Sequence, residues 1–125
     1  MMQVSYKEKI LGTVSFEHGF HFSTEKGVYT GTTAISLADF AQKLETIDVN
    51  SILFHYPRGD FQKWIEETLG DNELANQMCF IKTGISGEEL RKQLIKLVQK
   101  RIYEFRESIA KLSESNAHVA EELKG

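Results

Sequence analysis

The last third of the chain carries a long, unbroken helical pattern. Between Gly87 and Gly125 there is neither proline nor glycine. Apolar residues recur there every three or four positions, which places them on one face of an α-helix. The stripe consists of Leu90, Leu94, Val98, Ile102, Phe105, Ile109 and Leu112, and it resumes in phase at Val119 and Leu123. The capping-box pattern Ser86-Gly87-Glu88-Glu89 predicts where the helix begins.

This helix is too long for the domain that carries it. From residue 87 to residue 124 it would extend about 57 Å, at about 1.5 Å per residue. A compact domain of 125 residues has a radius of gyration near 14 Å and spans roughly 35–40 Å. We therefore expect a long helix over residues 86–113 and a tail over residues 114–125 that is either helical or frayed.

Two explanations of the excess length remain open. The tail frays after Ser113, or a second copy of the chain covers the stripe, as in a helix pair. In the second case the chain is a homodimer. Its interface would then comprise Val98, Ile102, Phe105, Ile109 and Leu112.

Length and composition restrict the class of protein. The 125 residues suit a single domain over residues 1–125, and 41% hydrophobic residues can fill a core. No apolar run is long enough for a membrane span, and no signal-peptide pattern opens the chain. A single cysteine, Cys79, excludes a disulfide framework and the usual multi-cysteine zinc sites. We expect a cytoplasmic protein with no metal, no cofactor and no membrane contact.

The N-terminal part predicts β-structure. Apolar and polar residues alternate over residues 10–17, and Phe20 and Phe22 continue an apolar face, as in half-buried strands. Turns are expected at His18-Gly19 and Glu25-Lys26-Gly27. Residues 1–31 would thus form an antiparallel β-meander of two or three strands.

Short helices are predicted over residues 36–81. Ser36, Asp60 and Asp71 stand at expected N-caps. Pro57 should end the second helix at Tyr56 because proline disfavours helical geometry at the preceding residue, and Gly70 should end the third helix. The fold class is therefore α+β: a two- or three-stranded antiparallel meander packed on a mainly α-helical bundle with a long C-terminal helix.

Charge is segregated along the chain. Residues 37–80 contain eight acids and three bases, whereas residues 91–111 contain seven bases and two acids. Either the acidic middle neutralises the basic helix within the fold, or this helix attracts an anionic partner. We favour the first explanation because the complement lies in the same chain. The nucleic-acid alternative would use Lys92, Lys96, Lys100 and Arg106.

One group of residues predicts a ligand site. His55, Arg58, Asp60 and Trp64 gather around the expected helix break, and Tyr29 would line a neighbouring groove. Arg58 could bind a phosphate or carboxylate, with His55 as a hydrogen-bond donor or proton shuttle. The competing explanation is structural: Asp60 caps its helix, Arg58 pairs with an acid and His55 bonds a carbonyl. No convincing nucleophile or second base stands nearby.

Several motifs follow one another in a recognisable order. They are Phe20-His21-Phe22-Ser23-Thr24, Gly27-Val28-Tyr29-Thr30-Gly31, residues 34–40, residues 51–56, Arg58-Gly59-Asp60-Phe61 with Trp64-Ile65, Leu69-Gly70-Asp71 with Glu73-Leu74-Ala75, and Gly87-Glu88-Glu89-Leu90-Arg91. In order and spacing these motifs resemble a small prokaryotic domain family, common in archaea, of unknown function. The resemblance implies no activity, and it leaves out residues 8–17 and the tail after Ile109.

The sequence predicts a non-enzymatic binding or regulatory module that self-associates through its C-terminal helix. One alternative is a small sensor or enzyme for an anionic metabolite, using a pocket of His55, Arg58 and Tyr29. Another is a nucleic-acid-associated protein using the basic helix 91–111. Expected partners are a second copy of the chain and, beyond that, another protein; nucleic acid is disfavoured.

Overall fold

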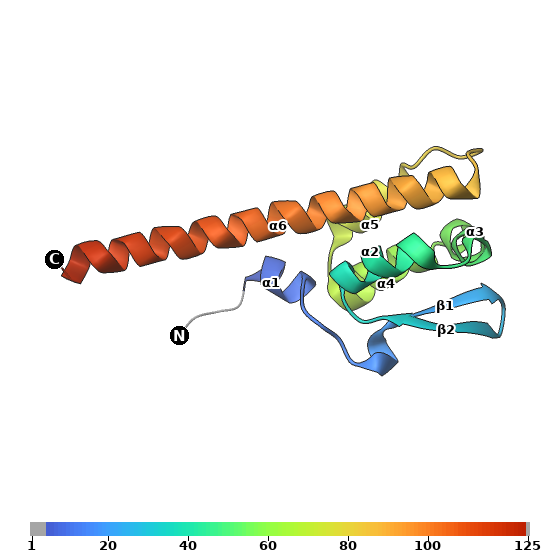
Figure 1. The fold of residues 1–125 in the computed structure, drawn as a ribbon, viewed down its shortest axis with the longest axis horizontal. Helices are drawn as coiled ribbons and strands as arrows, with labels where there is room; N and C mark the ends of the chain where they lie inside the picture. Colours follow the sequence, from blue (N-terminus) through green and yellow to red (C-terminus); the bar gives the residue numbers. More distant parts are fainter. Residues whose placement is uncertain (1–4, 125) are drawn as a thin grey trace.

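The structure, a computed structural model, describes the backbone of residues 5–124 and the side chains of residues 5–112. Helices α2, α3 and α4 lie between a β-hairpin and the long helix α6 (Figure 1). The elements are α1 (Tyr6–Ile10), the 3-10 turn η1 (Phe16–His18), β1 (Phe20–Glu25), β2 (Val28–Ala34), α2 (Leu37–Thr46), α3 (Val49–Arg58), α4 (Asp60–Trp64), the π-turn η2 (Ile65–Leu69), α5 (Asn72–Cys79) and α6 (Gly87–Lys124). The expected α+β class with a long C-terminal helix is confirmed.

The strand predicted over residues 10–17 is wrong. Ile10 is the last residue of α1, which is capped by the Ser5 hydroxyl; residues 11–15 form neither a strand nor a helix, and the η1 turn follows. Ile10 is buried, and the Tyr6 ring meets the edge of Phe105 on α6 at 6.1 Å between centroids. The four-residue spacing of Tyr6 and Ile10 suits a helix packed against α6, and this tertiary contact overrides the local alternation.

The hairpin therefore has two strands, β1 and β2, paired antiparallel with irregular register. Phe20 and Phe22 of β1 enter the core, whereas most of β2 is exposed. Gly19 ends the η1 turn, where its amide donates to the Phe16 carbonyl, and glycine is required there by close approach. A Cβ atom on Gly19 would lie 2.7 Å from the Thr33 methyl group and 2.8 Å from the Ala34 carbonyl oxygen.

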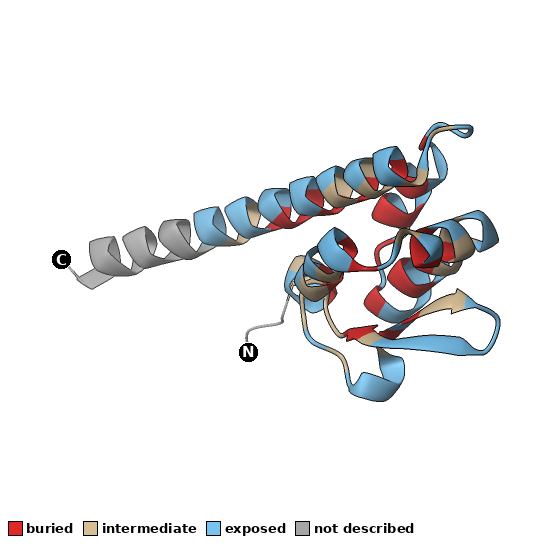
Figure 2. Ribbon diagram, turned by 45° about the vertical axis from the view of Figure 1, so that its right-hand side comes forward, coloured by how far each residue is buried: buried red, intermediate tan, exposed pale blue. Residues whose placement is uncertain are grey.

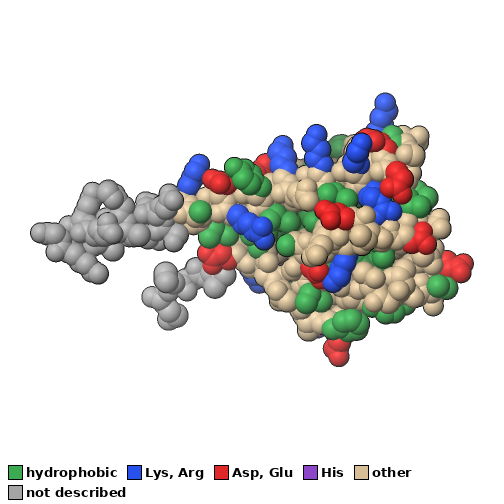
Figure 3. All heavy atoms as spheres, in the orientation of Figure 1, with side chains coloured by type: hydrophobic (Ala, Val, Ile, Leu, Met, Phe, Trp, Pro, Cys, Tyr) green, Lys and Arg blue, Asp and Glu red, His purple; other side chains and the backbone are tan. Residues whose placement is uncertain are grey.

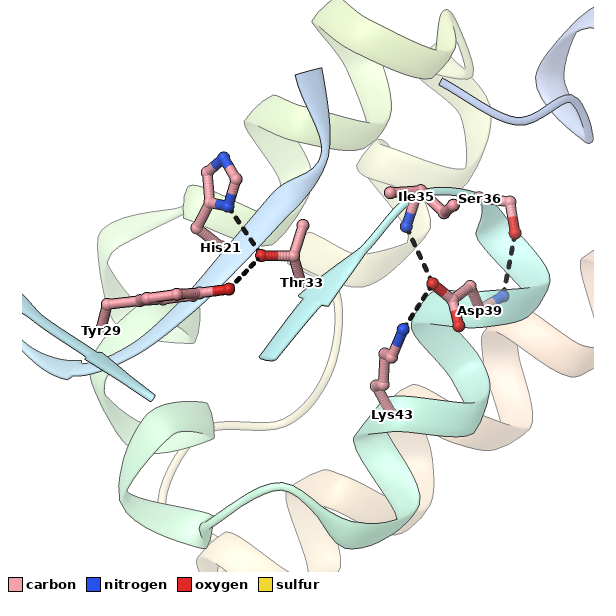
Figure 4. Close-up of polar contacts among 7 residues, drawn as sticks. All are labelled: His21, Tyr29, Thr33, Ile35, Ser36, Asp39 and Lys43. Atoms are coloured by element: carbon pink, nitrogen blue, oxygen red, sulfur yellow. Dashed lines mark hydrogen bonds and ion pairs between the residues drawn. The ribbon is translucent and has the colours of Figure 1, made fainter. Parts of the chain in front are cut away.

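The start of α2 follows the predicted cap. The Ser36 hydroxyl accepts a hydrogen bond from the Asp39 amide at 3.1 Å. The Asp39 carboxylate accepts from the Ile35 amide at 3.0 Å and from the Lys43 ammonium at 2.7 Å (Figure 4). These bonds satisfy free amides of the first turn and join the end of β2 to α2.

Two of the helix ends predicted in the middle of the chain differ in the structure: the end of α3, and the cap of α4, which is described below with the site. Helix α3 continues through Pro57 to Arg58 and ends at Gly59, whose φ of 75° is left-handed. Proline is tolerated so close to the helix end because the glycine that follows supplies the chain reversal. Gly70 and Asp71 have their predicted roles: Gly70 is left-handed, and Asp71 accepts from the Leu74 amide at 3.0 Å.

The apolar stripe of α6 forms one side of the core. Buried positions run along the face of α6 that meets the other helices (Figure 2). They are Leu90, Leu94, Val98, Arg101, Ile102 and Phe105. The Ser86 hydroxyl accepts from the Glu89 amide at 3.1 Å, which confirms the predicted cap.

A buried ion pair joins α5 to α6. The Arg101 guanidinium donates two hydrogen bonds of 2.8 Å to the Asp71 carboxylate, and it lies 3.2 Å from Glu73. Its positive charge also stacks on the Phe105 ring at 4.2 Å. The hydrogen bonds to Asp71 raise the pKa of Arg101 above its ordinary value. The acidic middle thus neutralises part of the basic helix within the fold, as we favoured from the sequence.

We expect Arg101→Ala to lower the free energy of unfolding by about 3–5 kcal/mol, because it leaves the Asp71 carboxylate buried without its partner. Lys100→Ala changes the neighbouring, exposed residue and should stay within about 0.5 kcal/mol of wild type. Urea unfolding followed by circular dichroism measures both values. Equal effects of the two substitutions would contradict a special role for the buried pair.

Candidate functional site

Three of the predicted site residues, His55, Arg58 and Asp60, meet at the corner between α3 and α4. The left-handed Gly59 turns the chain so that Asp60 comes back beside the end of α3. The Asp60 Oδ2 atom lies 2.9 Å from His55 Nδ1 and 3.0 Å from Arg58 Nε. His55, Arg58 and Asp60 therefore form one hydrogen-bonded group, as the sequence suggested.

Both nitrogen atoms of the His55 ring are occupied. The Ser23 backbone amide of β1 donates to His55 Nε2 at 2.8 Å. An amide can only donate, so Nε2 holds the lone pair and Nδ1 carries the proton that is shared with Asp60. The ring is 5% exposed and lies against Phe20 and Phe61, with centroid distances of 4.7 and 5.5 Å. Its hydrogen bonds thus connect the hairpin to the corner.

Burial sets the charge state of the group. Burial lowers the pKa of His55 below its ordinary 6.5 and outweighs the opposing effect of Asp60. Burial by itself would raise the pKa of Asp60, but the hydrogen bonds from His55 and Arg58 outweigh it and lower that pKa below 3.8. At neutral pH the corner therefore holds a neutral imidazole, a carboxylate and a guanidinium.

Two structural expectations at this corner need correction. Asp60 does not cap α4, because its carboxylate is used by His55 and Arg58 while Gly59 stands at the N-cap position. His55 bonds a backbone amide and a carboxylate instead of a carbonyl. Arg58 is the most open of the three: its side chain is 54% exposed, against 29% for Asp60, and it stacks on the Phe54 ring at 4.7 Å.

Trp64 and Tyr29 have other partners. The Trp64 indole donates to the His18 carbonyl at 2.8 Å, and the residue is buried. The Tyr29 hydroxyl lies 2.6 Å from the Thr33 hydroxyl, which also meets His21 Nδ1 at 2.8 Å (Figure 4). The rings of Tyr29 and His21 pack edge to face at 5.9 Å. Strand alternation sends His21 to the face opposite Phe20 and Phe22, so Tyr29 lies across the hairpin from His55.

A second candidate surface is a groove between α5 and α6. It has a volume of about 540 Å³. Its lining comprises Gln77, Phe80, Ile81, Glu89, Lys92, Gln93, Lys96, Leu97 and Lys100. Basic side chains project in a row along α6 (Figure 3). The sequence pointed to the three lysines but not to Phe80, which is 84% exposed. The exposure of Phe80 could have been inferred from its position outside the inward helix face that Leu74 and Met78 form.

The residues predicted for self-association fall into two classes. Val98, Ile102 and Phe105 are buried within their own chain, so they offer no free surface in this fold. The Tyr6 ring of α1 and the Arg101 guanidinium lie against Phe105. Ile109 is half-buried, and Leu112 is 56% exposed. Val119 and Leu123 lie outside the described side chains.

Comparison with known families decides the classification. A family model described as a family of unknown function, DUF5752, matches residues 17–119. The chain belongs to this family. The DUF5752 match bears out the resemblance to a family of unknown function and reaches beyond Ile109, where the recognised motifs ended. The searches of curated proteins and of solved structures found no match.

Membership of DUF5752 assigns no activity, so chemistry has to be judged from the residues. Within residues 5–112, no three His, Cys, Asp or Glu side chains are grouped to hold a metal ion. No helix in the described part of the chain combines the length and apolar character of a membrane span. The described residues thus provide a buried, hydrogen-bonded histidine, His55, and two exposed features: the Arg58 side chain and the groove between α5 and α6.

We expect the stability of the protein to fall as the pH is lowered from ~7.5 to ~5. The folded state keeps His55 neutral because its pKa is lowered, whereas the unfolded chain takes up a proton below 6.5. The stability that His55 contributes is fully present above pH 6.5, and it is lost as the pH falls towards the pKa of His55 in the folded state. The stability that Asp60 contributes is lost only at lower pH, below 3.8.

Urea unfolding between pH ~7.5 and ~5 measures how the free energy of unfolding depends on pH, and two variants test whether His55 causes this dependence. His55→Gln should flatten the dependence and lower the stability at neutral pH. His18→Gln replaces an exposed histidine and should keep the wild-type slope. An unchanged slope in His55→Gln would show that the buried ring is not its source.

Proposed function

We propose that this chain is a non-enzymatic binding or regulatory module that self-associates through the projecting part of α6. One observation carries the proposal: α6 runs to Lys124, whereas the last residue of α6 in the core is Phe105. The helix thus continues for roughly 28 Å past that point, at about 1.5 Å per residue. An isolated helix of this kind gains stability mainly by packing its apolar face against a partner.

The interface begins where the intramolecular cover ends. Ile109 and Leu112 continue the stripe of Phe105 at steps of four and three residues, the spacing of paired helices. Leu112 exposes more than half of its surface. The stripe repeats in the sequence at Val119 and Leu123. A second copy presenting the same face would cover these positions in a symmetric pair.

The polar corner supports a role without catalysis. A proton-transferring histidine needs a ring nitrogen within reach of substrate, and both nitrogens of His55 are bonded inside the protein. Arg58 alone is open to an anion, and Tyr29, the third residue of the alternative metabolite pocket, bonds Thr33. The arrangement therefore favours binding through surfaces over a small-molecule reaction.

We expect the full chain to form a concentration-dependent dimer, and Leu112→Glu to weaken it at least tenfold, or about 1.4 kcal/mol. The substitution places a charge on the apolar stripe of each helix. Sedimentation equilibrium measures the dissociation constant.

Ala110→Glu is the matched control, since Ala110 is exposed on α6 beside the stripe. It should leave the dimer intact. At concentrations low enough for wild type to be monomeric, both variants should melt like wild type, because neither side chain is buried within its own chain and no dimer then adds to the stability. A protomer that stays single at every accessible concentration would overturn the proposal.

A further inference from the structure

We propose that the groove between α5 and α6 binds an acidic segment of another protein that carries one apolar side chain. The groove lies on the part of α6 that belongs to the core, from Glu89 to Lys100. The segment proposed for self-association begins about two turns further on, at Ile109. The two proposals therefore concern different surfaces, and either can fail without the other.

The charge of the groove identifies the first requirement for a partner. Lys92, Lys96 and Lys100 line it at intervals of four residues, so they repeat about every 6 Å along α6. Lys100 has only a distant partner, Glu104 at 4.0 Å. Within residues 5–112, no carboxylate pairs with Lys92 or Lys96. In an extended peptide, alternate residues are separated by roughly 6.6 Å, which matches the spacing of the lysines.

The apolar part of the groove identifies the second requirement. Phe80, directly after α5, is 84% exposed, the highest value among the large apolar side chains of residues 5–112. The buried Ile81 and the half-buried Leu97 line the same groove. An exposed aromatic ring beside such apolar side chains is typical of interface anchors, because a partner's side chain seated there removes the ring from water.

Two features favour a protein over a nucleic acid. Proteins that bind single strands present successive aromatic platforms to stacked bases, whereas this groove has one aromatic residue. Glu89 also lines it; its carboxylate repels anionic groups of either kind of partner, but it can accept hydrogen bonds from the backbone amides of a polypeptide, which a phosphate backbone lacks. A polypeptide with spaced acids and one apolar residue satisfies all of these groups together.

The test uses the full chain and a fluorescein-labelled probe peptide in which glutamate alternates with serine around a central leucine. Fluorescence anisotropy at about 50 mM salt, where screening is weak, measures its dissociation constant. We expect Lys96→Glu and Phe80→Ala each to weaken binding about tenfold. A peptide with glutamine in place of glutamate should bind at least tenfold more weakly.

Matched controls separate the groove from general charge and hydrophobicity. Lys111→Glu makes the same charge change at an exposed position of α6 outside the groove, and Tyr103→Ala removes another exposed aromatic ring from that helix. Both should bind the probe like wild type. Circular dichroism should show that all four variants remain folded, since each changes an exposed side chain.

Three outcomes would overturn the inference: no binding of the probe, equal loss in the groove variants and their controls, or tighter binding of a mixed-sequence single-stranded oligonucleotide than of the peptide. The last result would make the groove a nucleic-acid site. None of these results depends on whether the chain dimerises, because the anisotropy of each variant is compared with that of wild type at the same concentration.

Discussion

The fold depends on one buried imidazole that joins three elements. His55 belongs to α3, accepts a hydrogen bond from the β1 backbone at Ser23 and donates one to Asp60 at the start of α4. A two-stranded hairpin is marginal by itself, and this one is anchored by the histidine and by Phe20 and Phe22. Burial keeps the ring neutral, which the bond from the amide requires. The residue that most resembled a catalytic group is therefore a structural joint.

The long helix α6 has a part that is buried in the core and a part that extends beyond it. Its first part packs in the core, where Arg101 pairs with Asp71 and is held over Phe105. Phe105 is buried and Leu112 is exposed, so the boundary between covered and uncovered stripe lies near Ile109. Our two proposals for this DUF5752 member accordingly concern surfaces: the projecting helix for a second copy, and the groove for an acidic partner.

Some expectations were reliable because they depend on short-range chemistry. The caps at Ser36, Asp71 and Ser86 and the helix end at Gly70 all follow from hydrogen bonds within a few residues. Others failed because distant contacts overrode local preference. The alternation over residues 10–17 suggested a strand, yet Ile10 ends helix α1, which packs on α6, and the residues after it form an irregular stretch and the start of η1. Asp60 looked like a cap but bonds His55 and Arg58 instead.

By itself, the sequence determined the α+β class, the long amphipathic helix and its excess length, since periodicity and capping are local and repeat over many residues. Only the tertiary structure decided which polar side chains have all their hydrogen-bond partners inside the fold. Whether His55 has a free nitrogen depends on the Ser23 amide, and whether Phe80 is exposed depends on how α5 meets α6. Both are long-range packing facts, because they join segments that no local pattern relates.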